Sequence, residues 1–203
     1  CLTNLGHQSQ QLELMEHIDF FRGHDLASSR LLAWLAPPGM QEWGPWQVTF
    51  AGMGNLFIQD TFKLDDKLLV LVMELPILGV DAAFCGALVR SLMNGPYRQY
   101  QQQESLLLTQ PHRLLDYLNL QLLESGLRHS FAMAALLFDQ EDGLVFANAG
   151  LTSPHWLMRS GGLPLGLMRS SRYGLHKRSW HEPFELQFRS DSGSALKMQV
   201  RHH

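Results

Sequence analysis

The stretch KLLVLVMELPILGVDAA, Lys67–Ala83, decides the fold that this sequence predicts. Its first part, Leu68–Met73, is a continuous apolar run of strand length, ended by Glu74 and Pro76. A half-exposed strand alternates apolar and polar residues, whereas a continuous apolar run is typical of a strand covered on both faces. The stretch therefore predicts a buried strand, then a turn, then the start of a helix.

The segments on either side of this strand carry helix and turn signals. The helix is expected over Ala82–Met93, because Asn94, Gly95 and Pro96 follow it. On the other side, Leu56–Leu64 reads as a strand, and the turn Asp65-Asp66 joins it to the buried strand. We expect these two strands to form a hairpin.

The rest of the chain predicts more strands and one more helix. Trp46–Phe50 alternates like a strand after a loop at Gln41–Gly44, and Pro111–Glu124 has leucines at helical spacing before Gly126. Later short strands are expected at Phe131–Phe138, Leu144–Asn148, His155–Arg159, Tyr173–Trp180, Phe184–Phe188 and Ala195–Val200. Strands, then helices, then more strands predict an α+β domain.

Two helices are expected before this domain core, over residues 8–24 and over Leu26–Leu35. The first has one apolar stripe, formed by Leu12, Met15, Ile18 and Phe21. This stripe packs either on its own domain or against a neighbouring domain or partner. We interpret residues 1–24 as an inter-domain linker helix that follows a missing upstream domain, and residues 25–203 as the domain itself.

Composition limits the classes of function. The chain has 203 residues, a net charge of −3 and a pI near 6.4, without a lysine and arginine cluster, which argues against a nucleic-acid partner. Its longest apolar stretch is too short to span a membrane. The two cysteines, Cys1 and Cys85, have no disulfide or metal spacing, and the histidines lack the spacing of a zinc site. We expect a cytoplasmic protein without a cofactor.

The central stretch resembles the SpoIIE-type branch of the PPM (protein phosphatase 2C-like) phosphatases. In that family the segment reads Gly-Asp-Val-Ser-Gly-His-Gly-x-x-Ala-Ala, and its aspartate helps to hold the metals that activate water. Here Glu74 falls at the aspartate and Leu78 at the histidine, while Gly79, Ala82 and Ala83 match. The resemblance implies two packed antiparallel β-sheets flanked by helices.

Weaker matches follow in the family's order along the chain. Phe57 falls at the first aspartate of a Gly-Asp-Phe-Tyr-Asp motif and Asp60 at the second, while Asp191 lies near a Thr-Asp-Gly motif. Further matches are Asn119, the strand ending in Asp139, the Asn-Ala-Gly of Leu144–Gly150, where Leu151 replaces a histidine, and the Gly162–Gly166 loop. A two-metal centre needs several converging carboxylates. We therefore expect a pseudophosphatase, with degenerate metal positions at Phe57, Asp60, Glu74, Leu78 and Asp191.

A closer resemblance is to the effector domains of RssB-type response regulators, through the helix pair ending in Pro37-Pro38, Arg90–Gly95, Asn148–Leu151 and the Pro-Leu-Gly loop. It implies an adaptor in two-component signal transduction and the stress response. Such adaptors bind the stationary-phase sigma factor σS (RpoS) and deliver it to ClpX of the ClpXP protease. Phosphorylation of their own receiver domain promotes this delivery, and anti-adaptor proteins block it.

Two other functions stay open on the residues alone. One is an active serine phosphatase of a sigma-factor partner switch, with Asp60, Glu74 and Asp191 as a reduced manganese site. The other is a scaffold that binds an antagonist without either activity. For the adaptor, the candidate partner-binding residues are Leu12, Met15, Ile18, Phe21, Trp43, Trp46, Ile77 and Leu78. Most of the tryptophans are expected in the core, and an exposed anchor in a loop rich in proline and glycine is the alternative for Trp43 and Trp46.

Overall fold

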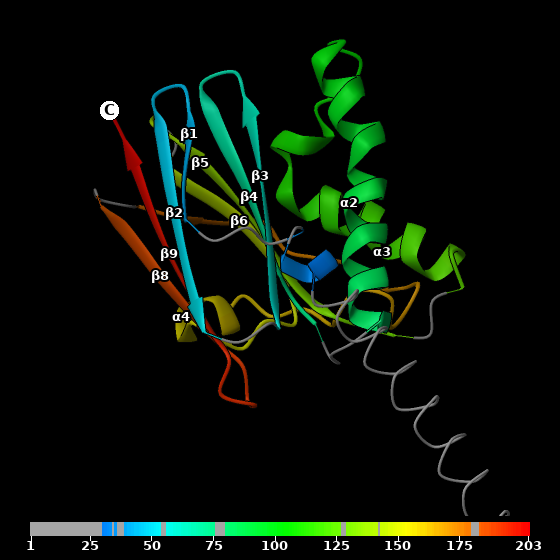
Figure 1. Ribbon diagram of the computed structural model, residues 1–203. Helices are drawn as coiled ribbons and strands as arrows, with labels where there is room; N and C mark the ends of the chain where they lie inside the picture. Colours follow the sequence, from blue (N-terminus) through cyan, green and yellow to red (C-terminus); the bar gives the residue numbers. More distant parts are fainter. Residues whose placement is uncertain are drawn as a thin grey trace, which may run out of the picture.

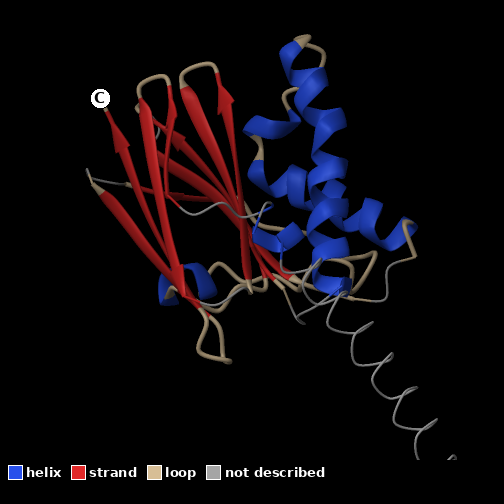
Figure 2. Cartoon of the chain, in the orientation of Figure 1, coloured by secondary structure: helices blue, strands red, loops and turns tan. Residues whose placement is uncertain are grey.

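The structure is a computed structural model that describes residues 30–33, 35, 39–53, 56–75, 80–126, 129–141, 143–179 and 183–203, without the side chains of Met53, Val80 and Asp81. It has three layers (Figures 1 and 2). A four-stranded sheet packs on one face of a five-stranded sheet, and the helices α2 (Val80–Gln101) and α3 (Pro111–Glu124) cover the other face.

The five-stranded sheet forms the middle layer and contains the stretch that decides the fold. Its order is β3-β4-β5-β6-β7, and all neighbouring strands are antiparallel. The strands are β3 (Phe57–Leu64), β4 (Lys67–Glu74), β5 (Ala132–Asp139), β6 (Gly143–Ala149) and β7 (His176–Arg178). Side chains 68–73 of β4 are all buried, as predicted, because β4 has a layer on each face. The hairpin of β3 and β4 through Asp65 and Asp66 is also confirmed.

The four-stranded sheet is an outer layer with one buried face. Its order is β1-β2-β9-β8, and the strands are β1 (Gly39–Trp43), β2 (Trp46–Met53), β8 (Phe184–Arg189) and β9 (Ala195–His202). Along β8, buried and exposed side chains alternate, because successive side chains of a strand point to opposite faces. Only the face toward the five-stranded sheet contributes to the core.

Two hydrophobic cores follow from this layering. Between the sheets, Leu68, Val70 and Val72 of β4 pack with Phe50, Phe188 and Met198 of the outer sheet. Between the middle sheet and the helices, Leu69, Leu71 and Met73 pack with Leu114, Leu118 and Leu122 of α3. The neighbouring side chains of β4 thus alternate between the two cores. The predicted fold class, two packed antiparallel sheets flanked by helices, is confirmed.

The helix expected to end before Pro96 continues through it, so that prediction is wrong. Helix α2 contains Pro96 and ends at Gln101, although an interior proline costs about 3 kcal/mol in a helix. Two contacts hold the last turns against the hairpin of β3 and β4. Tyr97 packs on Phe62 with ring centroids 5.4 Å apart, and the Tyr100 hydroxyl donates to Asp65 over 2.6 Å. These tertiary contacts outweigh the local stop signal.

Two shorter predictions are also wrong. The expected loop at Gln41–Gly44 is mostly strand β1, since residues 39–43 pair with β2. The expected strand at His155–Arg159 is a single helical turn, α4 (His155–Met158), because the chain there bonds to Asn148 rather than to a neighbouring strand. Between α2 and α3 lies one 3-10 turn, η1 (Leu107–Thr109).

The linker helix expected within residues 1–24 lies outside the described residues. In the described part of the chain, no helix is long and apolar enough to cross a membrane.

Candidate functional site

The first candidate position is the end of the hairpin where β3 begins and β4 stops. Phe57 and Glu74 are register partners there, so their side chains lie on the same face of the sheet. Phe57 is buried in the core between the sheets, and its ring centroid is 6.3 Å from that of Phe188. An apolar ring therefore occupies the position at which the resembling family has a metal-binding carboxylate.

Glu74 has an acidic neighbour at this end of the sandwich. Burial raises the pKa of the Glu74 carboxyl above its usual value, and the negative charge of Asp191 raises it further. Asp191 lies in the turn between β8 and β9, which the Ser190 amide closes by donating to the Ser194 carbonyl over 2.9 Å. The structure thus brings together three of the predicted positions, Phe57, Glu74 and Asp191.

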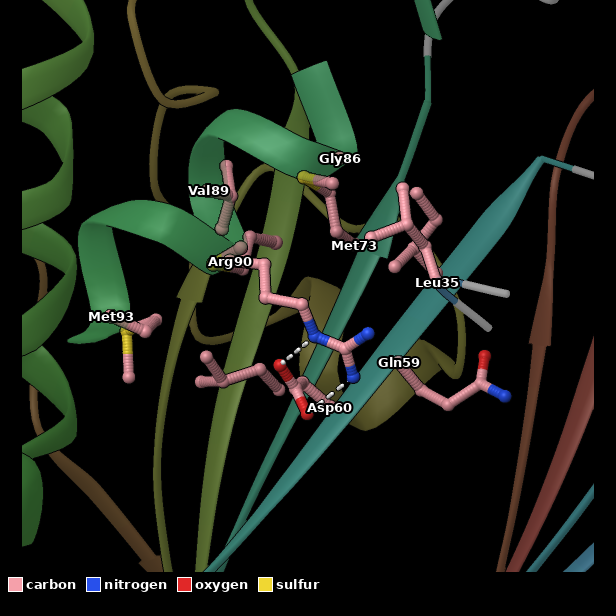
Figure 3. Close-up of a pocket in the computed structure, with 11 residues that line it drawn as sticks. Leu35, Gln59, Asp60, Met73, Gly86, Val89, Arg90 and Met93 are labelled. Atoms are coloured by element: carbon pink, nitrogen blue, oxygen red, sulfur yellow. Dashed lines mark hydrogen bonds and ion pairs between the residues drawn. The ribbon is translucent and has the colours of Figure 1, made fainter. Parts of the chain in front are cut away.

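Asp60 faces the opposite layer, toward α2, and is part of an ion pair (Figure 3). The Arg90 guanidinium donates from Nε to one Asp60 oxygen over 3.0 Å and from Nη2 to the other over 3.1 Å. The Thr61 amide donates to Asp60 over 3.0 Å as well. Both carboxylate oxygens are therefore engaged by a cation and a backbone donor. Asp60 and Glu74 point to opposite faces of the sheet, so the structure does not bring together the three carboxylates of the predicted reduced manganese site, Asp60, Glu74 and Asp191.

A cavity of about 20 Å³ lies beside this ion pair, between α2 and the middle sheet. Its walls include Met73, Gly86 and Met93, which surround the Arg90 side chain in Figure 3. That volume holds about one water molecule. Helix α2 approaches the sheet closely here, since a Cβ on Gly86 would lie 2.4 Å from the Ile58 side chain. The cavity is a packing feature and has no room for a substrate.

Two asparagines of the resembling motifs hold loops in place. The buried Asn148 amide donates to the carbonyls of Leu151 and Leu157, each over 2.9 Å, and accepts from the Leu151 amide over 3.0 Å. Asn119 donates to the Met168 carbonyl and accepts from the Gly166 amide, each over 2.9 Å. Both side chains satisfy backbone groups that a loop would otherwise leave unpaired. The geometry gives them a structural role.

Asp139 lies at the far end of the sheet from Glu74. It ends β5, pairs with Lys67 at the start of β4 and accepts from the Glu141 amide over 2.9 Å. Among the described residues, no three His, Cys, Asp or Glu side chains lie close enough to hold a metal ion. The donors described at the Glu74 end, two carboxylates beside a phenylalanine, do not fit a two-metal centre.

The predicted partner-binding residues have mixed outcomes. Trp46 is fully buried between the sheets, where its indole donates to the Asp66 carbonyl over 2.8 Å, so it is a core residue and the alternative of an exposed anchor is wrong for it. Trp43 is half-buried against the same core. The candidates Leu12, Met15, Ile18, Phe21, Ile77 and Leu78 lie outside the described residues.

Sequence reasoning missed the role of Arg90 as the partner of Asp60. The two residues are 30 positions apart, and no spacing rule joins a strand residue to a helix residue over that distance. A weak signal was available. Asp60 shares one face of its strand with Ile58 and Phe62, and a half-buried carboxylate among apolar side chains needs a cation or several donors.

The sequence matches no protein-family profile and no curated protein. Among solved structures, the RsbU and RsbW domains of Rv1364c from Mycobacterium tuberculosis match 77% of this chain with a TM-score of 0.56 and 12% sequence identity. This chain spans 61% of the length of that structure. RsbX in complex with magnesium matches 81% of this chain and 98% of its own, with a TM-score of 0.49 and 11% identity.

The likeness to the first of these structures shows that this chain has a PPM-like fold. It agrees with the two antiparallel sheets and the helical layer described above. At 12% identity the likeness shows the fold alone.

Proposed function

We propose that this chain is the non-catalytic effector domain of an RssB-type response-regulator adaptor, which binds the sigma factor σS (RpoS) and delivers it to the ClpXP protease. One observation supports a non-catalytic role: the two faces of the hairpin separate Asp60 from Glu74. Asp60 pairs with Arg90 on the helix side, and Phe57 occupies the space beside Glu74 between the sheets. In this proposal the PPM-like scaffold serves recognition and not hydrolysis.

The proposal includes regulation by an upstream receiver domain and by anti-adaptor proteins. Its proposed contact surfaces are the stripe Leu12, Met15, Ile18 and Phe21, and the apolar residues Ile77 and Leu78, where the resembling family has catalytic loop residues. An apolar stripe on a linker helix exchanges between two packing partners, and phosphorylation of the receiver would bias that exchange. These surfaces follow from the sequence and from the resemblance.

The test is binding and delivery of σS by the purified chain. We expect σS to bind in a calorimetric titration, and the chain to accelerate ATP-dependent degradation of σS by ClpXP. Met15→Asp with Phe21→Asp should weaken σS binding at least tenfold, because each places a charge in an apolar contact. The matched control is Glu13→Gln, which lies off the stripe and should leave binding unchanged. Failure of the unaltered chain to bind σS would overturn the proposal.

A manganese-dependent phosphatase is the second candidate, favoured by the mutual repulsion of Glu74 and Asp191. A divalent cation between these carboxylates would relieve that repulsion. The assay is hydrolysis of p-nitrophenyl phosphate with excess manganese. Turnover that disappears in Glu74→Gln would establish this candidate and contradict the adaptor proposal, which expects no turnover.

A further inference from the structure

An open cleft of about 270 Å³ lies between α4 and β7, the strand at one edge of the middle sheet. Phe146 and Trp156 form its apolar wall, and His176 lies beside them. None of Phe57, Glu74 and Asp191 lines this cleft, so it is separate from the degenerate metal positions.

The cleft is strongly basic in a chain whose net charge is −3. Arg159, Lys177 and Arg178 line it, and none of its lining residues in the described part of the chain is acidic. The ion pairs formed within the described part of the chain do not include Arg159 or Arg178. Cations that gather in a concave site without carboxylates concentrate the positive potential there and attract anions.

Aromatic rings hold this site in shape. The Arg178 guanidinium lies over the Trp156 ring, with its Cζ atom 4.8 Å from the ring centroid. Trp156 packs edge-on against Phe146 with centroids 4.9 Å apart, and Phe146 stacks on His176 at 5.4 Å. A guanidinium stacked on a ring keeps its N–H edge free for a carboxylate, and its orientation is fixed before binding. Pre-organised donors lose less entropy when a ligand binds.

The helical side of the cleft is also fixed. Arg159 follows α4 directly, and the Asn148 side chain ties α4 to β6 by donating to the Leu157 carbonyl over 2.9 Å. The cations therefore project from two elements that are both anchored to the middle sheet. On β7, residues 176 and 178 share the face toward the aromatic rings, because side chains alternate along a strand.

Among the anions that a basic cleft could bind, the neighbouring strand edge and the covered aromatic rings favour an acidic peptide. Strand β7 is last in the order of its sheet, so one side of its backbone faces away from β6 and can align an extended segment. The Phe146 ring is buried, and Trp156 is half-buried under Arg178, so neither ring offers a free face for stacking a nucleobase. The chain's net charge of −3 also argues against a nucleic acid.

We propose that the cleft between α4 and β7 binds an extended acidic segment of a partner protein, whose carboxylates pair with Arg159 and Arg178. This site goes beyond the adaptor function and does not depend on it. The segment lies along β7 and places alternate acidic side chains in the cleft.

The test uses the whole chain and a fluorescein-labelled octapeptide of alternating Glu and Asp residues, followed by fluorescence anisotropy. The peptide should bind, and more salt should weaken binding. Arg159→Gln and Arg178→Gln should each raise the Kd about tenfold, the usual effect of losing a hydrogen bond between charged groups. Both side chains are exposed, so the fold should survive. Arg201→Gln removes an exposed charge from β9 and should leave the Kd within about twofold.

Trp156→Phe provides a second variant that keeps both arginines. The variant should raise the Kd of the peptide severalfold, because it removes the indole under Arg178 and tryptophan forms the strongest cation–π contact among the aromatic side chains. Equal binding by the unaltered chain and the Arg159→Gln, Arg178→Gln double variant would overturn the proposal. Equal binding of a Gln and Asn octapeptide would overturn it too. So would competition by inorganic phosphate alone at the same concentration, or a preference for phosphatidylserine vesicles over the peptide.

Discussion

Asp60 and Glu74 belong to the same hairpin, but their side chains enter different layers of the molecule. Asp60 points toward α2, where Arg90 and a backbone amide engage both of its oxygens. Glu74 points between the sheets, where its neighbours are the Phe57 ring and the carboxylate of Asp191. The negative charge of Asp60 on the helix side is neutralised by Arg90. The negative charge of Glu74 between the sheets is disfavoured by burial and by the charge of Asp191. The difference shows that a motif in the right sequence order need not converge in space.

The largest effect should come from returning an acid to the space between the sheets. Phe57→Asp removes a buried ring and adds a carboxylate near two others, so we expect a loss of about 5 kcal/mol in the free energy of unfolding. Thermal and urea unfolding measure it. Manganese should raise the melting temperature of this variant, because a bound cation stabilises only the folded state.

Phe57→Leu is the control for Phe57→Asp, since it keeps the site apolar and should cost about 1.5 kcal/mol or less. It should show no response to manganese. If Phe57→Asp were as stable as Phe57→Leu without metal, the site between the sheets would already accommodate a further carboxylate, and the comparison between the two faces would fail.

A medium effect is expected on the helix side. Arg90→Ala should cost about 2 kcal/mol, because Asp60 stays half-buried without its cation, and a melting temperature lower by about 4–8 °C would report it. Combining Arg90→Leu with Asp60→Asn should recover most of the stability, since replacing both partners is often nearly neutral. Additive losses in the double variant would show that the ion pair contributes nothing beyond its single residues.

A smaller effect of opposite sign is expected at Glu74. Its raised pKa means that the folded chain holds the proton more tightly than the unfolded chain, so stability falls as the pH rises from the ordinary value of 4.5 through the folded pKa. Glu74→Gln removes this loss and should stabilise the chain by up to about 1 kcal/mol at pH 7. Unfolding series between pH 4 and 8 test this, with Glu42→Gln as an exposed control on β1. A destabilised Glu74→Gln at pH 7 would contradict it.

The smallest effect is expected from Asp191→Asn. This exposed residue supplies only the second cause of the raised Glu74 pKa, since burial comes first. The variant should therefore lower the pKa of Glu74 only in part and stabilise the chain by a few tenths of a kcal/mol at pH 7. NMR titration of the Glu74 carboxyl measures the shift directly. An unchanged pKa of Glu74 in this variant would show that the charge of Asp191 does not act on Glu74.

Much of the fold could be predicted because its signals are local and consistent. The continuous apolar run of β4 indicated two covered faces, and leucine spacing gave the bounds of α3, Pro111–Glu124. Failures arose where distant contacts outweighed local signals. Pro96 lies inside α2 because Tyr97 and Tyr100 hold the following turns on the hairpin.

The site was predictable only in part, since sequence order does not give side-chain direction across layers. The placement of Phe57, Glu74 and Asp191 together follows the expected order of motifs. Asp60 falls three residues after Phe57, an odd spacing, so on a strand it faces the other side. That alternation was available in the sequence. The partnership with Arg90 and the basic cleft beside β7 depend on packing between elements far apart in the chain.

The most direct test of the central claim is a pair of calorimetric titrations of the same purified chain, one with σS and one with manganese. The proposal that this PPM-like domain works by recognition predicts heat of binding with σS and none with manganese. Manganese binding that is lost in Glu74→Gln, without any σS binding, would contradict it and establish a metal site between the sheets.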